Sequence, residues 1–401
     1  MNAKALNLED LRRSAKRRLP KIVFDFVEGG VEDEKCLARN SASFDRYTLV
    51  PRYLLDVSQR SQSIELFGRQ FDAPFGVSPM GLAGLAHPGV DLLLAQVAKE
   101  ANLPYLMSSV SNASIEDAVR IAGKNAWFQI YPTADEKINT DLVRRALALQ
   151  IETLVVTVDV PVSSNRERNR RNGFSRPLTM TPGVMLNALM HPRWVMNFLR
   201  TGGIPMMQNW QPYAAPGASA DVVADLFAAL TPPPEMTWAK VEAIRAAWPG
   251  NLVLKGILSP TDAVRAVEIG IDGIIVSNHG GRQLDAAPAP LDVFPAIKAA
   301  VGDRAALILE SGVRRGSDVV KAVALGAKLC LFGRPWVYGA ASGGVAGARQ
   351  VAHIMKREID LVLGQIGCAG LGEVSSRVAQ SVPATQHTIL SMPPRETADR
   401  I

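Results

Sequence analysis

Eight short apolar segments recur along the chain, and most of them are followed by residues with helical periodicity. The segments are Phe75–Pro79, Tyr105–Ser109, Trp127–Tyr131, Leu154–Asp159, Leu252–Gly256, Gly273–Ser277, Ala306–Ser311 and Leu329–Phe332. Short apolar runs that end in polar or small residues are typical of buried parallel strands. Eight strand-then-helix units favour an α/β fold of the (β/α)8 barrel type, the TIM barrel, over an open doubly wound sheet. No Gly-x-Gly-x-x-Gly motif follows any segment, so a Rossmann domain has no support.

Further elements are predicted before and after the barrel. Two short helices, Leu8–Arg18 and Lys21–Glu28, are separated by Pro20. Apolar residues at helical spacing between Val351 and Ile366 predict a terminal helix that packs on the barrel. We therefore predict a single domain over residues 1–401, with the barrel at about 73–370 and a long insertion after the fourth strand at about 168–220.

Polar residues and glycines mark the ends of several barrel helices. Ser114 and Ser259 precede acidic first turns, as N-cap residues do. Gly270 and Gly326 lie just before predicted strands, where helix C-caps are expected.

The composition excludes several classes of protein. Of the 401 residues 47% are hydrophobic and 20% are charged, which indicates a core-forming globular protein. Three widely spaced cysteines, Cys36, Cys330 and Cys368, argue against a disulfide framework or a zinc site and for a reducing compartment. The net charge of +6 fits acidic substrates or anionic lipid, but no basic stripe with interleaved aromatic residues suggests nucleic acid. We find no signal peptide and no apolar run of the roughly 20 residues that cross a bilayer.

The insertion has an unusual composition. Residues 168–220 contain no Asp or Glu, but six arginines, six of the twelve methionines, and the aromatic residues Trp194, Phe198 and Trp210. Basic side chains beside Met, Leu and Trp fit a surface that dips into anionic lipid. A long active-site lid with a methionine stripe facing the core fits the residues equally well.

Functional groups in such a barrel project from the C-terminal ends of the strands. Those positions carry Ser108, Gln129, Tyr131, Thr157, Asp159, Lys255, Ser277, His279, Glu310, Gly333 and Arg334. His279 can accept a proton near neutral pH, and Arg282 can bind a planar carboxylate with two hydrogen bonds. A base and an anion clamp three residues apart suggest chemistry beside a carboxylate. The Gly- and Arg-rich segments Ser311–Gly316 and Gly333-Arg334 fit a phosphorylated cofactor.

The tract Ser277–Asp285 resembles the active-site signature of the FMN-dependent 2-hydroxy acid oxidase and dehydrogenase family. The resemblance covers nearly the whole chain and includes Leu19-Pro20-Lys21, Trp127–Tyr131, Thr157–Asp159, Lys255-Gly256, Gly312–Gly316 and Gly333-Arg334. Within the family the chain is similar to the membrane-associated (S)-mandelate dehydrogenases, because Ser111–Asp117, Arg166–Arg168 and His191–Trp194 resemble that branch. The corresponding insertion binds the membrane in that branch, so the resemblance favours membrane contact, at about 177–215, over the lid.

The resemblance implies a role for each matching residue. His279 would accept a proton from the substrate, Asp159 would hold the resulting imidazolium, and Lys255 would lie at the N1/O2 edge of the flavin. Arg282 and Arg166 would bind the substrate carboxylate, Tyr131 its hydroxyl oxygen, and Phe26 stands at a further substrate-binding position. The implied FMN contacts are Pro79, Met80, Gly81, Ser108, Gln129, Thr157, Lys255, Ser277, Glu310, Gly312, Arg314, Gly333 and Arg334. No metal is implied.

Three positions depart from the family pattern. Phe26 replaces a tyrosine that binds the carboxylate, and losing that hydrogen bond would cost on the order of 1.5–3 kcal/mol of substrate binding. Met80 replaces a threonine, and Glu310 replaces an aspartate at a cofactor contact. None of the three removes the base or the clamp, but together they suggest an unusual substrate.

The function expected from these residues is FMN-dependent oxidation of an (S)-2-hydroxy acid, mandelate-like or lactate-like, to the 2-oxo acid. A hydride route and a carbanion route would need the same base and the same clamp. Electrons would pass to a membrane quinone or an electron-transfer partner, from a homotetramer bound peripherally at the cytoplasmic face of the inner membrane. A cytosolic oxidase that uses oxygen, and a degenerate paralogue that binds flavin without turnover, are the alternatives.

Overall fold

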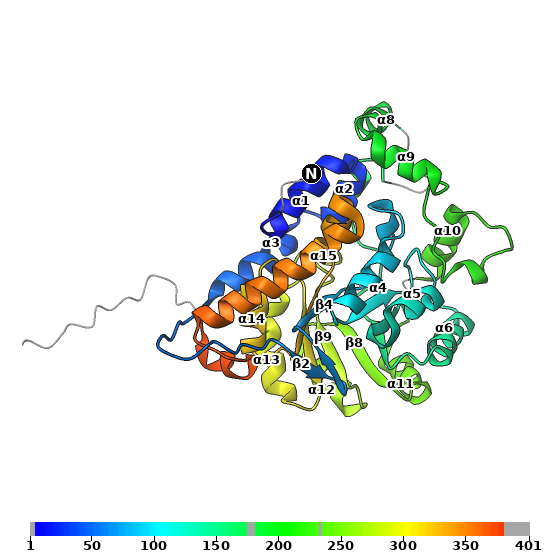
Figure 1. Ribbon diagram of the computed structural model, residues 1–401. Coiled ribbons are helices and arrows are strands. Elements are labelled where there is room, and N and C mark those ends of the chain that lie inside the picture. Colours follow the sequence, from blue (N-terminus) through cyan, green and yellow to red (C-terminus); the bar gives the residue numbers. More distant parts are fainter. Residues whose placement is uncertain (1–4, 175–180, 232–234, 381–401) are drawn as a thin grey trace, which may run out of the picture.

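The computed structural model describes residues 5–174, 181–231 and 235–380. Eight parallel strands close into a barrel, and helices surround it (Figure 1). The strands are β4 (Phe75–Val77), β5 (Tyr105–Ser108), β6 (Ala126–Ile130), β7 (Thr153–Thr157), β8 (Asn251–Ile257), β9 (Gly273–Val276), β10 (Ala306–Glu310) and β11 (Leu329–Phe332). Each strand overlaps one of the apolar segments in the sequence, and β11 pairs with β4 to close the ring. The predicted (β/α)8 barrel is therefore confirmed.

The interior of the barrel is filled in layers, because every second side chain of a strand points inward. One layer is apolar and contains Leu106, Trp127, Val155, Val253, Ile275, Ile308, Leu329 and Leu331. The antiparallel hairpin of β2 (Ile64–Leu66) and β3 (Arg69–Phe71) adds Leu66 and Phe71 to this layer. Phe67 in its turn lies against Gly273, the first residue of β9, so the hairpin covers the N-terminal end of the barrel.

The next inward layer toward the C-terminal ends is polar. It consists of the residues two positions after those of the apolar layer, namely Ser108, Gln129, Thr157, Lys255, Ser277 and Glu310, all of them buried. Because side chains alternate along a strand, this polar layer lies directly on the apolar layer, and the mouth of the barrel lies above it. We call the polar layer the polar floor.

The outer helices pack on the barrel as the sequence predicts. They include α4 (Val90–Glu100), α5 (Ile115–Ala122), α6 (Glu136–Ala148), α10 (Ala220–Leu230), α11 (Trp238–Ala247), α12 (Pro260–Glu268), α13 (Pro290–Val301) and α14 (Gly316–Ala324). The side chains of Ser114 and Ser259 accept hydrogen bonds from the backbone N–H groups of Asp117 and Asp262, which confirms both N-caps. Gly270 and Gly326 follow α12 and α14 with positive φ, the conformation that ends a helix.

The terminal segments pack against each other beside the barrel. Helices α1 (Leu8–Arg18) and α2 (Lys21–Glu28) have the predicted bounds. The terminal helix is confirmed as part of α15 (Arg334–Gln365), which is broken at Gly343 and Gly344. It lies alongside α1, where the Ser342 hydroxyl donates to the Leu11 carbonyl at 3.0 Å. Helix α3 (Lys35–Ala42) and the 3-10 turns η1 (Ser43–Arg46) and η5 (Leu371–Arg377) lead to the short ladder of β1 (Tyr47–Leu49) with β12 (Val378–Gln380).

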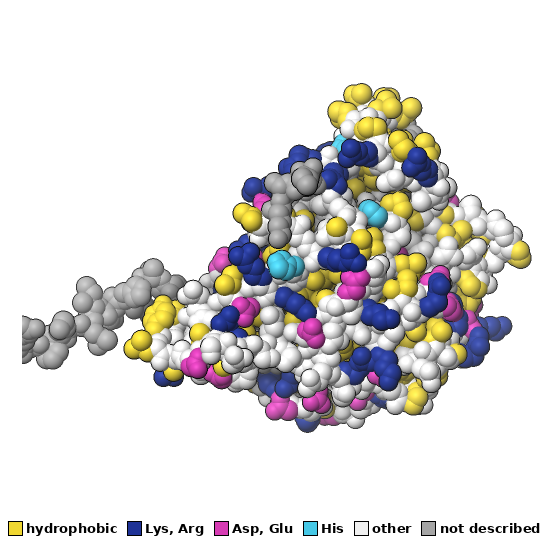
Figure 2. All heavy atoms as spheres, in the orientation of Figure 1, with side chains coloured by type: hydrophobic (Ala, Val, Ile, Leu, Met, Phe, Trp, Pro, Cys, Tyr) yellow, Lys and Arg dark blue, Asp and Glu magenta, His cyan; other side chains and the backbone are white. Residues whose placement is uncertain are grey.

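The insertion leaves the barrel after β7 and projects from it. It begins with α7 (Glu167–Arg171) and continues through α8 (Pro182–Leu189), α9 (Pro192–Arg200) and the turn η4 (Gln211–Tyr213). Part of the acid-free stretch, residues 175–180, lies outside the described residues. Helices α8 and α9 have no buried residue, and Figure 2 shows apolar side chains gathered on them. The large exposed apolar residues there are Met185, Leu186, Leu189, Met190, Met196 and Leu199.

Several hydrogen bonds fix the insertion to the barrel, and two of them mark where it leaves and where it returns. The Trp194 indole N–H donates to the Leu85 carbonyl at 2.7 Å, at the loop after β4. On the return, the Asn209 side chain accepts from the Ile115 N–H at 2.8 Å. In the described part of the chain no helix is long and apolar enough to cross a bilayer.

Candidate active site

A cavity of about 520 Å³ opens at the C-terminal ends of the strands. Most of the site residues expected from the sequence line it, namely Phe26, Pro79, Met80, Gly81, Tyr131, Arg166, Lys255, His279, Arg282, Glu310, Gly312, Arg314, Gly333 and Arg334. Four more, Ser108, Gln129, Thr157 and Ser277, belong to the polar floor beneath it. Asp159 lies behind His279. The structure therefore brings all the expected residues to one end of the barrel.

His279 is held between two side chains. Its Nδ1 lies 2.9 Å from Asp159 Oδ1, and its Nε2 lies 3.3 Å from the Tyr131 hydroxyl. Because an ionised carboxylate only accepts, Nδ1 carries the proton, and the lone pair of Nε2 faces the Tyr131 hydroxyl and accepts from it. His279 also has a φ of +58°, a left-handed conformation that is strained for a residue with a side chain. Such strain is commonly kept at functional sites.

The electrostatics of the pair favour a neutral imidazole beside a charged carboxylate. Burial lowers the pKa of His279 below 6.5, although the nearby Asp159 opposes this shift. Burial alone would raise the pKa of Asp159, but His279 and Lys255 outweigh it, and the net shift is downward. In its resting state His279 is therefore able to accept a proton at neutral pH.

Lys255 and Glu310 form a buried ion pair in the polar floor. Lys255 Nζ lies 2.6 Å from Glu310 Oε2, and the Ser277 hydroxyl donates to the same carboxylate oxygen at 2.5 Å. Asp159 Oδ2 is 4.0 Å from Lys255 Nζ. Burial would lower the pKa of Lys255, but the two carboxylates raise it overall. Lys255 is therefore a fixed positive charge at the bottom of the cavity.

Among the arginines that line the cavity without a carboxylate partner in the described residues are Arg166, Arg282 and Arg334. Arg282 Nη1 donates to the backbone carbonyls of Phe26 and Gly29, at 2.9 and 3.0 Å. Arg334 donates to the carbonyls of Val27 and Gly29, and Arg166 Nε donates to the Ser164 hydroxyl at 3.1 Å. Two of them thus cap the C-terminal end of α2.

Burial lowers the pKa of each of these arginines, and repulsion from Arg166 and Arg334 lowers the pKa of Arg282 further. Guanidinium groups remain charged in proteins, so the downward shifts mean that the surroundings disfavour the charge. A bound anion would relieve this cost. The cavity therefore has a place for a carboxylate and for a phosphate.

The residues present also fit the flavin that the sequence implies. Gln129 Oε1 accepts from the Ser108 hydroxyl at 2.7 Å, but Gln129 Nε2 and the Thr157 hydroxyl are buried without a hydrogen-bond partner in the described structure. Buried polar groups normally have partners, and the carbonyl and nitrogen edge of an isoalloxazine ring could supply them. Gly312, Arg314, Gly333 and Arg334 line the same cavity, and they could hold a phosphate.

Gly280 is required for the shape of this wall. Its φ is +66°, and a Cβ built on it would lie 2.7 Å from Arg334 Nη1. Any larger residue would push Arg334 from its place. Two other members of the tract are structural, because the Asp285 carboxylate accepts from the Cys36 N–H at 2.8 Å and the Asn278 side chain bonds to Asn40.

Several cavity residues could not be assigned from the sequence, among them the large side chains Phe174, Phe227 and Met207. Phe174 stacks on Phe26 with ring centroids 4.6 Å apart, and Phe227 packs edge-on to Tyr131. Met207 lines the same wall. Phe174 and Met207 lie at the two ends of the insertion, so the insertion serves as a cavity wall as well as a projection. The many methionine and aromatic residues of the insertion are the available signal in the sequence. They do not indicate which of these side chains face the cavity.

Comparisons with known proteins agree with this geometry. The family model described as FMN-dependent dehydrogenase matches residues 15–381. (S)-mandelate dehydrogenase from Pseudomonas putida is 38% identical over 385 residues, 96% of each chain. 4-hydroxymandelate oxidase from Amycolatopsis orientalis is 38% identical, over 92% of this chain and 96% of the other. The crystal structure of the monotopic membrane protein (S)-mandelate dehydrogenase superposes with a TM-score of 0.91 at 38% identity, covering 94% of this chain and all of that one.

The matched family, the fold and the cavity lead to the same conclusion. The members of the matched family are FMN-dependent oxidoreductases that act on 2-hydroxy acids, of the mandelate or the lactate type. The chain belongs to the FMN-dependent dehydrogenase family and is an FMN-dependent 2-hydroxy acid dehydrogenase or oxidase.

Proposed function

We propose that this enzyme oxidises an (S)-2-hydroxy acid to the 2-oxo acid with His279 as the base. The observation that carries the proposal is the arrangement around His279. Asp159 Oδ1 holds its Nδ1 at 2.9 Å, Tyr131 is on its other side, and Arg282 and Arg166, which have no carboxylate partner in the described structure, line the same cavity. A base, a hydroxyl partner and a carboxylate clamp are the groups that removal of a proton beside a carboxylate requires.

Each of these residues has a distinct task. Arg282 and Arg166 bind the substrate carboxylate and fix its orientation. The Tyr131 hydroxyl bonds to the substrate's hydroxyl oxygen, and burial raises its pKa to about 12, so it keeps its proton. His279 Nε2 takes a proton from the bound acid. Bound FMN supplies the two-electron acceptor for the oxidation.

The charge that forms on His279 is balanced by its neighbours. Asp159 stabilises the imidazolium through the Nδ1–H bond, in the way that a buried acid supports a catalytic histidine elsewhere. Lys255 stays protonated through its ion pair with Glu310 and keeps a positive charge in the polar floor, which would favour negative charge on a flavin held in the cavity.

The wall around this site favours an aromatic acid. Phe26, Phe174 and Phe227 contribute apolar and aromatic surface beside Tyr131. The relatives named for mandelate and 4-hydroxymandelate support the same preference, whereas others are named for lactate.

The projecting helices support peripheral contact with a membrane. Met185, Leu186, Leu189 and Met190 expose half or more of their surface on or next to α8, and the superposed (S)-mandelate dehydrogenase is described as monotopic. We therefore propose a quinone or another membrane-bound electron acceptor, with the enzyme at the cytoplasmic face of the inner membrane. A soluble oxidase that uses oxygen is the second candidate, because some relatives are named as oxidases.

The electron acceptor that the enzyme reduces distinguishes the membrane-linked dehydrogenase from the soluble oxidase. With (S)-mandelate as substrate, we expect a soluble quinone analogue to be reduced as fast as benzoylformate forms, with peroxide far below the product. Peroxide equal to the 2-oxo acid would favour the oxidase. No product with either acceptor, from protein that contains FMN, would leave only flavin binding without turnover.

The pH dependence of kcat/KM should report His279. Because the base must be neutral and its pKa is lowered below 6.5, kcat/KM should be constant through neutral pH and fall only below that lowered value. Asp159→Asn removes a charge that raises this pKa, so its acid limb should lie at still lower pH. An unchanged limb in Asp159→Asn, measured over the same pH range, would contradict the assignment.

Phe26→Tyr should improve substrate binding. The added hydroxyl stands beside the Arg282 guanidinium, which lies over the Phe26 ring at 5.4 Å, and it can donate to the substrate carboxylate. A hydrogen bond to a charged group corresponds to about a tenfold gain in kcat/KM. Phe24→Tyr, in the same helix but buried outside the cavity, is the matched control. A tenfold loss in Phe26→Tyr would show that the substrate needs an apolar surface at this position and that a hydroxyl there weakens binding.

A further inference from the structure

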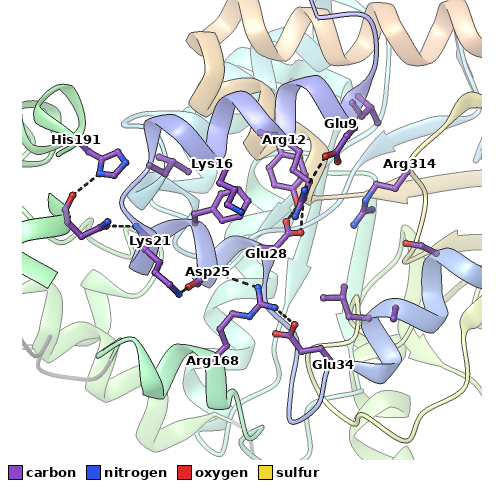
Figure 3. A pocket seen from close by; sticks show the side chains of 18 of the residues that line it. Glu9, Arg12, Lys16, Lys21, Asp25, Glu28, Glu34, Arg168, His191 and Arg314 are labelled. Atoms are coloured by element: carbon purple, nitrogen blue, oxygen red, sulfur yellow. Dashed lines mark hydrogen bonds and ion pairs between the residues drawn. The ribbon is translucent and has the colours of Figure 1, made fainter. Parts of the chain in front are cut away.

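A second cavity, of about 890 Å³, lies beside the active site and outside it. Its walls come from α1, α2, α3, Arg168 of α7, Asn187 and His191 of the projecting segment, and Tyr338 of α15 (Figure 3). Arg314, assigned above to the cofactor phosphate, lines its far side, so only the part of the cavity next to α1 and α8 is considered below.

The lining of this part is charged, with the two signs in balance. Arg12, Lys16, Lys21 and Arg168 face the four carboxylates of Glu9, Asp25, Glu28 and Glu34, while Arg315 on the far side pairs with Glu358. All four carboxylates are already paired with lining residues, as Figure 3 shows for Glu28 with Arg12 and for Glu34 with Arg168. Lys16 has no ion-pair partner within the described ranges and is exposed at the edge. Lys16 is therefore the cation of this part that is left available to an anion.

The cavity opens at the foot of the apolar projection. The Lys21 N–H donates to Asn187 Oδ1 of α8 at 2.6 Å, and His191 Nδ1 bonds to the Asn187 carbonyl at 2.7 Å. Both Asn187 and His191 line the cavity. The same helix exposes Met185, Leu186 and Leu189, and in Figure 2 basic side chains lie just below these apolar ones. Apolar side chains beside a basic rim are the arrangement of an interfacial anchor.

We propose that this cavity binds the phosphodiester headgroup of an anionic phospholipid, with Lys16 as the residue that meets the phosphate. The inference rests on the membrane contact proposed above and adds a lipid preference to it. When α8 and α9 enter the acyl boundary, the cavity lies at the level of the headgroups. Arg12, Lys21 and Arg168 keep their carboxylate partners and supply the polar wall, while Lys16 supplies the uncompensated charge.

Vesicle co-sedimentation of the FMN-loaded enzyme tests this. The wild type should bind vesicles of phosphatidylcholine with phosphatidylglycerol more tightly than vesicles of phosphatidylcholine alone. Lys16→Gln should weaken binding to the anionic vesicles about fivefold, the effect of one basic residue near a charged surface. Arg17→Gln is the matched control, because Arg17 follows Lys16 in α1, is exposed as well and does not line the cavity. Its effect should be clearly smaller.

Ala38→Trp fills the cavity without changing the charge. Ala38 is exposed on α3 and lines the cavity, so the variant should lose the preference for anionic vesicles but keep its flavin content and its binding to neutral vesicles. Equal losses in Lys16→Gln and Arg17→Gln, or an undiminished preference in Ala38→Trp, would overturn the headgroup site and leave membrane contact intact. A wild type that binds neither kind of vesicle would refute membrane contact and the headgroup site together.

Discussion

Replacing His279 with glutamine should lower kcat/KM for the preferred 2-hydroxy acid by about a thousandfold. General base catalysis by a positioned side chain contributes roughly 10²–10⁴ in rate, and glutamine cannot accept the proton. The side chain lies between Asp159 and Tyr131, so an amide of similar reach can keep one hydrogen bond and the local fold. The loss should appear in kcat and in the rate of flavin reduction, with little change in FMN content.

The matched control is His353→Gln, which changes an exposed histidine of α15. It should leave both rates at the wild-type value. An activity within about tenfold of the wild type in His279→Gln would mean that another group takes the proton, and the account of the site would be wrong.

Arg282→Lys should raise KM by about tenfold to a hundredfold. A hydrogen bond to a charged group is worth about 1.5–3 kcal/mol, and lysine keeps the charge but loses the planar two-pronged geometry. The same arginine also bonds to the Phe26 and Gly29 carbonyls, so the variant is expected to loosen the end of α2 as well. Binding of the 2-oxo acid product, measured by perturbation of the flavin spectrum, should weaken in parallel with KM.

Arg170→Lys tests whether the substrate carboxylate is bound by Arg282 itself or by the overall positive charge of the cavity. Arg170 lines the same cavity but is exposed at its edge. It should change KM by no more than about twofold, the range of a surface charge. If both variants raised KM equally, the carboxylate would be held by the overall positive potential of the cavity and not by Arg282.

The fold and the polar floor could be predicted because both follow from strand periodicity. Each barrel strand buries its inward apolar residue, such as Val253 in β8, and the residue two positions later, such as Lys255, meets the mouth. One strand therefore indicates both the core and the site. The bounds of α1 and α2 were equally accessible, because Pro20 separates two amphipathic runs.

Other features depend on tertiary contacts that no local pattern encodes. The α2 carbonyls capped by Arg282 and Arg334 join residues about 250 to 300 positions apart. The break of α15 at Gly343 and Gly344 interrupts an otherwise helical run, and glycine is tolerated within helices often enough to hide it. The substitution of Glu310 was visible in the sequence, but its ion pair with Lys255 was not. The oligomeric state stays a prediction.

Anaerobic flavin reduction tests the central claim most directly. The purified enzyme should be yellow, and one of (S)-lactate, glycolate, (S)-mandelate or (S)-4-hydroxymandelate should bleach it in the absence of oxygen, with one 2-oxo acid formed per flavin. Under the same conditions His279→Gln should stay yellow for about a thousand times longer. A colourless protein that cannot be reconstituted with FMN, or a flavin that none of the four acids reduces, would contradict the account.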